Sequence, residues 1–393
     1  MSDREGLRSR LSKLSLAICF ACAVALIALF YPTLRVKILK IEPWTADWRT
    51  VLLSDRVSIS YPGIVVVIIN NKTLEGYPYT SPTPRDLIAK VVRSVDAAHP
   101  AVIGLDFYFA KPTDKDNDLI GALRMAKAPI VVGAIDRRYP QFTPAEFDFQ
   151  KQFLAATGRC AGYNELLHEK DDVVRYTAAP ADPDYPESFA LLVAKSVKPS
   201  DLPSPTRIAW LLGPDTDLDP FATISAETLF QDTGMDAATL GRAQEQAQRL
   251  NGKVVLISGE YPYLDRHRTP LSLWTGSNML GVKIHANIVA QLVDGRRYFA
   301  LSVVQQEILF ATLSVLGFVL GWYFWRRRVD FLSLGVATVG LVVIDAIIFK
   351  SARIVLPFTL ALWGWFIGAT LGHHLHAVWA ASKVRYTRPH DID

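Results

Sequence analysis

The chain has 393 residues, of which 50% are hydrophobic and 20% are charged, so it is more apolar than an ordinary soluble domain. Its formal net charge of +4 is small, and much of that charge lies at the ends of apolar segments, which excludes a nucleic-acid-binding footprint. Its three cysteines form no paired metal-ligand pattern, and Cys160, alone in the polar region, predicts no disulfide there.

The first predicted element is an apolar run over residues 14–34, which is long enough to cross a bilayer as a helix. Its apolar core is long and no clear cleavage site follows before Tyr31, so we expect an uncleaved anchor rather than a signal peptide. Residues 1–13 precede it as an expected cytoplasmic N-terminus.

Residues 35–300 alternate segments typical of strands and of helices. IVVVIIN (64–70) is a continuous β-branched run, as expected of a strand buried on both faces. The alternation predicts an α/β fold with a mainly parallel sheet flanked by helices. The other predicted strands are residues 101–107, 129–135, 207–213 and 253–259, and helices are predicted to begin near residues 83, 116, 236 and 285. Residues 137–205 are rich in proline and predict a loop-rich insertion with one short helix near 187–197.

Polar residues follow several of these strands. Ligands of parallel sheets bind beyond the carboxyl ends of the strands, where Asn70, Asp106 and Ser258 are expected. Asp265 follows in the next loop, and His285 begins the next helix. The pattern predicts a polar rim that could bind a ligand. The alternative is that these side chains cap helices and bond loop backbone, as Asx residues do at such turns.

Three apolar segments follow residue 300 and predict three more transmembrane helices. Basic residues crowd the loop at 326–328 and the tail at 378–393, which places both termini in the cytoplasm. Residues 35–300 are then expected to lie outside a bacterial inner membrane. The predicted spans are residues 303–325, 331–349 and 354–377, which with residues 14–34 makes four.

Ionisable residues within the predicted spans are candidates for function. Glu307 and Asp345 lie near the outer ends of their spans, where an ion pair with the basic loop at 350–353 is the simpler alternative. His373 and His376 share a helix face at the inner end of the last span. They could hold a metal or haem, or they could be ordinary interfacial polar residues.

Known chemical motifs are not matched. DKDNDL (114–119) opens like a calcium loop, but Leu119 stands where glycine is needed and Met125 where glutamate is needed. No G-x-S-x-G occurs. Asp265, His267 and His285 could meet around a metal, but their spacing is not diagnostic, so neither a metal nor a cofactor is predicted.

Four separated stretches carry a resemblance to a known family. They are IVVVIINNKTLEG (64–76), PRDLIAKVVRSVDAAHPAVIGLDFYFAKPTDKDNDL (84–119), NGKVVLISGEYPYLDRHRTPL (251–271) and GVKIHANIVAQLVDG (281–295). In order along the chain they resemble the CHASE type-2 domain, a sensory extracellular domain associated with cyclases and histidine kinases. The order of one anchor, an outer domain and three closely spaced helices is also similar.

The resemblance implies an extracytoplasmic sensory module of a bacterial membrane protein, whose ligands are generally unknown. The family tends to have aspartates after its first strand, whereas this chain has Asn70 and Asn71, and an amide supplies neither charge nor protons. The resemblance makes the following residues candidates for ligand binding or for structure at the rim: Arg85, Asp106, Asp265, Thr269, His285 and Asn287, with Asn70 beside them.

Family members often continue into a catalytic domain, whereas this sequence ends soon after its last predicted span. We therefore expect that the protein is not an enzyme. We expect a sensor that relays a ligand or protein signal through its C-terminal helices to a separate partner. A homo-oligomer is a further alternative. The alternatives are a structural or assembly subunit of a membrane complex and, third, a hydrolase using Asp106, Asp265 and His285. We expect His285 mainly to lock its helix to the loop that carries Asp265 and Thr269.

Overall fold

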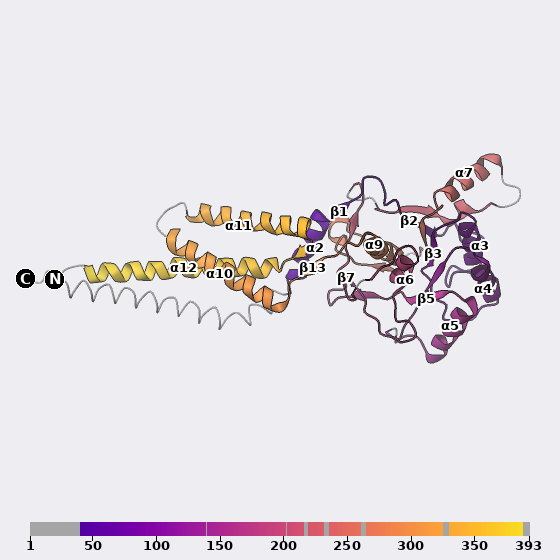
Figure 1. Cartoon of the computed structure of the whole chain (residues 1–393), viewed down its shortest axis with the longest axis horizontal. Helices are drawn as coiled ribbons and strands as arrows, with labels where there is room; N and C mark the ends of the chain where they lie inside the picture. The colour runs from indigo at the N-terminus through magenta and orange to yellow at the C-terminus, as the bar shows by residue number, and fades with distance from the viewer. Residues whose placement is uncertain are drawn as a thin grey trace, which may run out of the picture. The chain divides into compact units, whose positions relative to one another are not determined.

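The computed structural model describes residues 40–138, 140–201, 203–215, 219–231, 236–260, 265–324 and 330–387. The chain divides into two compact units. We call Thr50–Tyr298 the sheet unit, and the residues before and after it the helical unit (Figure 1). The predicted first span, residues 14–34, lies outside the described residues.

The sheet unit is built on six parallel strands, which confirms the predicted mainly parallel sheet. Strands β2, β3, β4 and β10 lie where continuous β-branched runs predicted them. The two strands that were not predicted, β5 and β9, are the two edges of the sheet. The spatial order is β5 (Cys160–Tyr163), β4 (Ile130–Ala134), β3 (Val102–Leu105), β10 (Val254–Gly259), β2 (Ile64–Ile69) and β9 (Ala222–Ser225).

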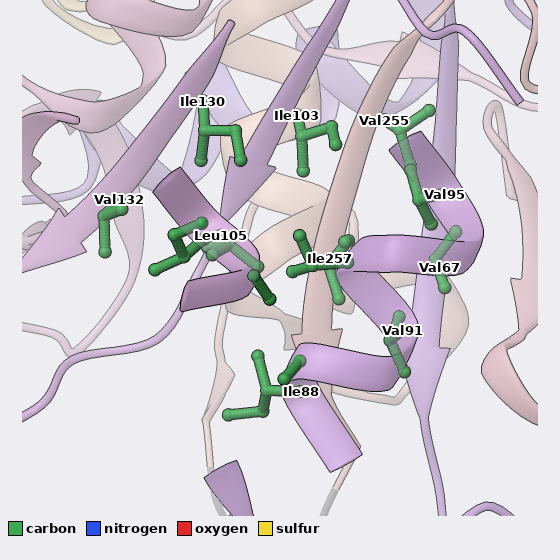
Figure 2. Packing of buried hydrophobic residues seen from close by; sticks show 14 of the residues in the cluster. Val67, Ile88, Val91, Val95, Ile103, Leu105, Ile130, Val132, Val255 and Ile257 are labelled. Carbon is green, nitrogen blue, oxygen red and sulfur yellow. The ribbon is translucent and has the colours of Figure 1, made fainter. Parts of the chain in front are cut away.

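Helices cover both faces of this sheet. Alternate strand residues such as Val67 and Ile257 pack against Ile88 and Val91 of the helix at Arg85–Asp96, as Figure 2 shows. The opposite set contacts the other helices, where Phe189 is fully buried. Each such side chain removed from water contributes about 1.5–3 kcal/mol. One face carries α3 (Arg85–Asp96), α4 (Asp116–Met125) and α5 (Pro144–Thr157), and the other carries α6 (Phe189–Lys195) and α9 (Gly281–Asp294).

Two sequence predictions are corrected in the sheet unit. Residues 207–213 do not join the main sheet, and only Leu211–Leu212 pairs as a strand, with Asp55–Arg56. The reason is that side chains of α9 bind the backbone of this segment: the amides of Ala209 and Leu211 donate hydrogen bonds to Gln291 and Asn287, respectively.

The stretch 137–205 is more regular than predicted, because it contains α5, β5 and a hairpin. Thr143 and Glu146 form a capping box at the start of α5, a sequence signal that could have located this helix. The smaller elements of the sheet unit are β1 (Asp55–Arg56), β6 (Leu166–His168), β7 (Val174–Thr177), β8 (Leu211–Leu212), η1 (Ala226–Leu229), α7 (Ala237–Gln248), β11 (Arg266–His267), α8 (Ser272–Thr275) and β12 (Met279–Leu280).

The helical unit contains two helices that are long and apolar enough to cross a membrane, Val303–Tyr323 and Leu334–Ala352. Three of the four predicted spans fall on described residues, and two of these three are found, so the prediction of a membrane span at residues 354–377 is wrong. The predicted fourth span forms a helix, but glycines, tryptophans and histidines such as His373 lower its hydropathy. The elements are α2 (Glu42–Leu53, which runs into the sheet unit), β13 (Phe299–Ala300), α10 (Val303–Phe324), α11 (Asp330–Ile347), η2 (Ile348–Ala352), β14 (Ile354–Val355) and α12 (Phe358–Thr387).

Helices α10 and α12 approach each other closely enough for their backbones to touch. A Cβ atom added at Gly368 would collide with the carbonyl oxygen of Ser314, and one at Gly321 with that of Ala369. Glycines spaced four residues apart on both helices, from Gly317 and from Gly364 onward, permit this approach. Such small-residue stripes are typical of helix pairs in membranes.

Candidate functional site

The predicted rim exists at the carboxyl end of the sheet. Asp106 directly follows β3, and its carboxyl group accepts hydrogen bonds from Ser258 Oγ of β10 and Asn164 Nδ2 after β5, each 3.4 Å long. On α9, His285 places its Nε2 3.2 Å from the carbonyl oxygen of Asn164 and 4.0 Å from Asp106 Oδ1. The parallel strands thus bring together three residues that the sequence assigned to this edge.

Burial makes the Asp106–His285 pair electrostatically unusual. Their side chains are 6% and 4% exposed, respectively. Burial, with a second contribution from the nearby carboxylate of Asp265, raises the pKa of Asp106 to about 8, although hydrogen bonds from Asn164 and Ser258 oppose this. Burial also lowers the pKa of His285 to about 4. At neutral pH the favoured state is therefore a protonated carboxyl group beside a neutral imidazole.

Several polar atoms near the rim are buried without a hydrogen-bond partner among the described residues. His285 Nδ1 is one, and its ring meets Phe189 edge-on with centroids 5.3 Å apart. A buried polar atom left unpaired costs about 1–3 kcal/mol unless something bound satisfies it. The others close along the chain to rim residues are Asn164 Oδ1, Glu165 Oε2 and Thr269 Oγ1.

The loop that starts at Asp265 is tied to α9 through a glycine. Gly281 donates its backbone N–H to the carbonyl of Asp265 over 3.1 Å. The Asp265 carboxylate also lies so close that a Cβ at Gly281 would be 2.8 Å from its Oδ2. The lock that we expected from His285 is therefore made by Gly281, while His285 bonds the backbone of Asn164.

A chain of side-chain contacts leads outward from Asp265. Asp265 Oδ1 lies 2.9 Å from His267 Nε2, and the other ring nitrogen of His267 lies 3.0 Å from His168 Nε2. The Nδ1 atom of His168 in turn lies 2.8 Å from Asp172 Oδ1. The sequence did not single out His168 or Asp172, because their approach depends on how the β6–β7 hairpin pairs with residues 266–268.

A cavity of about 310 Å³ is lined in part by residues that follow Asp265 in the same loop, from Arg266 to Leu280. Its polar lining includes two ion pairs, Lys283 with Asp219 and Arg266 with Glu260. The buried residue Thr269 also lines it. The sequence did not predict this cavity as such, although it did single out Thr269. The apolar lining residues include Val51, Leu211, Leu271, Trp274 and Leu280.

Two further rim candidates have structural roles. Asn70 accepts hydrogen bonds from the backbone N–H groups of Lys72 and Thr73, at 3.0 and 3.1 Å, which is the Asx-turn alternative. Asn287 accepts from the Leu211 amide over 2.9 Å and donates to the Lys283 carbonyl.

Arg85 also serves the fold. It is 4% exposed and donates to Asp116 over 3.2 Å. Its guanidinium group lies 4.3 Å from the ring centroid of Phe109, an arrangement that combines an ion pair with a cation–π contact. Arg85 therefore fastens α3 to the first residue of α4 and to the segment before it.

The candidates in the helical unit are also placed. Asp345 pairs with Arg49 over 2.9 Å, a partner that the sequence did not indicate. Arg49 also contacts Glu42 over 2.8 Å and the carbonyl oxygen of Leu356. Both members of the Arg49–Asp345 pair are less than 10% exposed in the side chain.

Glu307 lies near the start of α10. The rings of His373 and His374 are 5.6 Å apart, and His376 meets Trp322 edge-on at 4.9 Å. Within the described ranges, no group of three or more His, Cys, Asp or Glu side chains is arranged to hold a metal ion.

In a comparison with protein families, residues 21–324 match the family model described as the CHASE2 domain. The match covers more than half of the chain and includes the rim, the cavity and α10. Searches of curated proteins and of solved structures each return no match.

Proposed function

Because the chain belongs to the CHASE2 domain family, whose domains are sensory, we propose that it is a membrane-anchored sensor that binds a small ligand outside the cytoplasm. The observation that carries this proposal is the cavity whose wall continues into α9. Helices α10 and α11 are the proposed anchors. The inner-membrane location and the cytoplasmic termini stay predictions.

The charges around the cavity favour an anionic ligand with an apolar body. The lining has three cationic side chains and two carboxylates, and both carboxylates are paired. The remaining cation, Arg56, donates to the carbonyl oxygens of Gly213 and Pro214 and pairs with no carboxylate among the described residues. Trp274 and Leu271 offer apolar surface. A volume of about 310 Å³ suits a small molecule.

The route of the signal follows from chain connectivity. The segment from Arg266 to Leu280 contributes residues to the cavity lining and is followed directly by Gly281, the first residue of α9. A ligand that shifts this segment therefore acts on the start of α9, and the chain enters the helical unit at Phe299, shortly after that helix ends. We propose that the C-terminal helices then pass the change to a separate protein partner.

We propose that the sheet unit binds its ligand without converting it. Asp106 and His285 are too buried to reach a substrate, since each side chain is at most 6% exposed. The Nε2 atom of His285 also faces the carbonyl of Asn164, which limits its use as a base. A hydrolase would need an exposed nucleophile beside an available base.

The test compares two probes with the same tail and opposite charge, octanoate and octylamine, on the full chain in lipid nanodiscs. Hydrogen exchange is measured by mass spectrometry. We expect octanoate to slow exchange over residues 266–280 and in the first turns of α9, and octylamine to have no such effect. Arg56→Gln should abolish the octanoate effect, while Arg242→Gln, an exposed arginine on α7 outside the cavity, should retain it. Equal protection by both probes, or none by octanoate, would contradict an anion-binding cavity.

A further inference from the structure

The His168–His267 contact has a proton requirement that can be counted. The two imidazoles make three contacts in a row, with Asp172 at one end and Asp265 at the other. Ionised carboxylates only accept hydrogen bonds, so each outer contact needs an N–H group on the ring. The contact between the rings needs a third N–H. Two neutral imidazoles carry only two, so the full row exists only when the pair holds one additional proton.

We propose that His168 and His267 form a proton-binding latch, which makes the sheet unit respond to the pH outside the cytoplasm. When the additional proton leaves, the two remaining N–H groups stay on the carboxylates, because charged acceptors form the stronger hydrogen bonds. Two nitrogen lone pairs then face each other across 3.0 Å. That contact is repulsive, so the rings separate.

The latch joins two segments that are far apart in the sequence. His168 ends β6, and His267 ends β11. Beside the rings, the backbone N–H of Val174 donates to the carbonyl of Arg268 over 2.8 Å. Opening the latch therefore loosens the hairpin from the segment that also lines the cavity. The proposal that the histidine pair binds a proton does not depend on which ligand the cavity binds.

The charged and titratable groups around the pair come from several elements. Asp172 lies on the hairpin turn and Asp265 lies before β11, at the two ends of the row. Further in, Asp106 after β3 interacts electrostatically with Asp265, and His285 on α9 does so with His267. The two carboxylates favour a positive pair, whereas a charged His285 would oppose it.

The geometry fits a proton better than a metal ion. A separation of 3.0 Å is normal for an N–H···N hydrogen bond. Two histidine nitrogens bound to one tetrahedral zinc ion at about 2.0–2.1 Å would be roughly 3.3 Å apart. Among the described side chains, no third ligand joins these two histidines into a metal-binding group.

Two substitutions of His168 serve as references, one for the closed state of the latch and one for the open state. In His168→Gln, the side-chain amide carries two N–H groups, which can donate to Asp172 and to His267 without an added proton. In His168→Ala, the contact is lost at every pH. The experiment measures hydrogen exchange of residues 166–174 and 266–268 in the full chain in nanodiscs, with EDTA present. Wild type and variants are compared at the same pH, so the intrinsic pH dependence of exchange cancels.

We expect wild type to match the glutamine variant at pH 5.5 and the alanine variant at pH 8.5. Since one hydrogen bond is at stake, the difference in exchange should be about fivefold. His99→Gln, a change outside the pair, should behave as wild type. Wild type that follows one variant at all pH values overturns the proposal. Closure of the latch at pH 8.5 when ZnCl₂ replaces EDTA would also overturn the proposal, because the bound cation would then be a metal ion and not a proton. Thermal melting of each variant verifies folding.

Discussion

The contacts that stabilise the sheet unit internally differ in kind from those that stabilise the helical unit internally. In the sheet unit, branched apolar side chains fill the space between the sheet and the helices on both faces. In the helical unit, α10 and α12 touch through glycines, and a buried ion pair links Arg49 to Asp345. Water drives apolar side chains together, but lipid does not, because lipid tails are as apolar as leucine. The contrast fits the membrane anchor that we propose for the helical unit.

The largest effect should come from breaking the buried ion pair. Arg49→Met leaves both Asp345 and Glu42 without their cation, and an uncompensated buried charge costs about 3–5 kcal/mol. Asp345→Asn should cost less, because Arg49 keeps Glu42 as a partner. Thermal unfolding of the full chain in nanodiscs, with hydrogen exchange to localise it to α2 and α11, measures both. Equal costs for the two variants would show that Arg49 does not serve two carboxylates.

The same substitution in each unit tests the contrast directly. A Cβ at Gly104 in β3 meets the ends of two side chains, 2.6 Å from Leu256 and 2.9 Å from Phe189, which can shift. Gly104→Ala should therefore cost about 1–3 kcal/mol. A Cβ at Gly368 meets backbone, which cannot shift without moving a helix. Gly368→Ala should cost more than about 3 kcal/mol.

The control for this pair is Gly335→Ala in α11, where an added Cβ meets no atom within 4 Å. It should leave thermal unfolding unchanged or raise the melting temperature slightly, because alanine favours helices. Faster hydrogen exchange in both α10 and α12 of Gly368→Ala would locate the damage. If Gly368→Ala is as mild as Gly104→Ala, backbone contact does not hold this helix pair together.

The central strands were predictable and the edge strands were not, for a physical reason. A central strand such as Ile64–Ile69 is buried on both faces and must be continuously apolar, which is a strong signal. The edge strand Cys160–Tyr163 has an exposed end and reads CAGY, which resembles a loop. The helix α12 shows the opposite problem: it looked apolar, but its glycines and histidines lower its hydropathy below that of a clear membrane span.

The candidate site was predictable to the same limited extent. Asp106 and His285 follow from the rule that parallel strands present polar residues at their carboxyl ends. The pairing of His168 with His267 bridges 99 positions in the sequence, and it depends on a hairpin within a region predicted as irregular. The cavity has no sequence signature, because its walls come from several separate segments.

The smallest effect concerns the buried Asp106–His285 pair of the rim. The raised pKa of Asp106, about 8, means that the folded state holds a proton that the unfolded chain releases near 3.8. Its contribution to stability is complete below that lower value and is lost as the pH rises toward 8. The lowered pKa of His285, about 4, acts in the opposite direction below its ordinary 6.5. The two effects oppose each other between pH 4 and 6.5.

The effect of His285 is confined to pH values below 6.5, so the window from pH 6.5 to 8 separates Asp106 from it. Between pH 6.5 and 8 the free energy of unfolding of the wild-type protein should fall by about 2 kcal/mol. That of Asp106→Asn, which cannot ionise at this position, should not show this fall. Urea unfolding of both proteins at pH 6.5 and 8 measures the difference, and any contribution from the histidine latch cancels because both proteins contain it. Asp118→Asn, an exposed acid on α4, should keep the wild-type slope. A wild-type slope shared by Asp106→Asn would mean that Asp106 is already ionised at pH 6.5. The rim would then hold a buried charge, like the Arg49–Asp345 pair, and the contrast between the units would be smaller than their packing indicates.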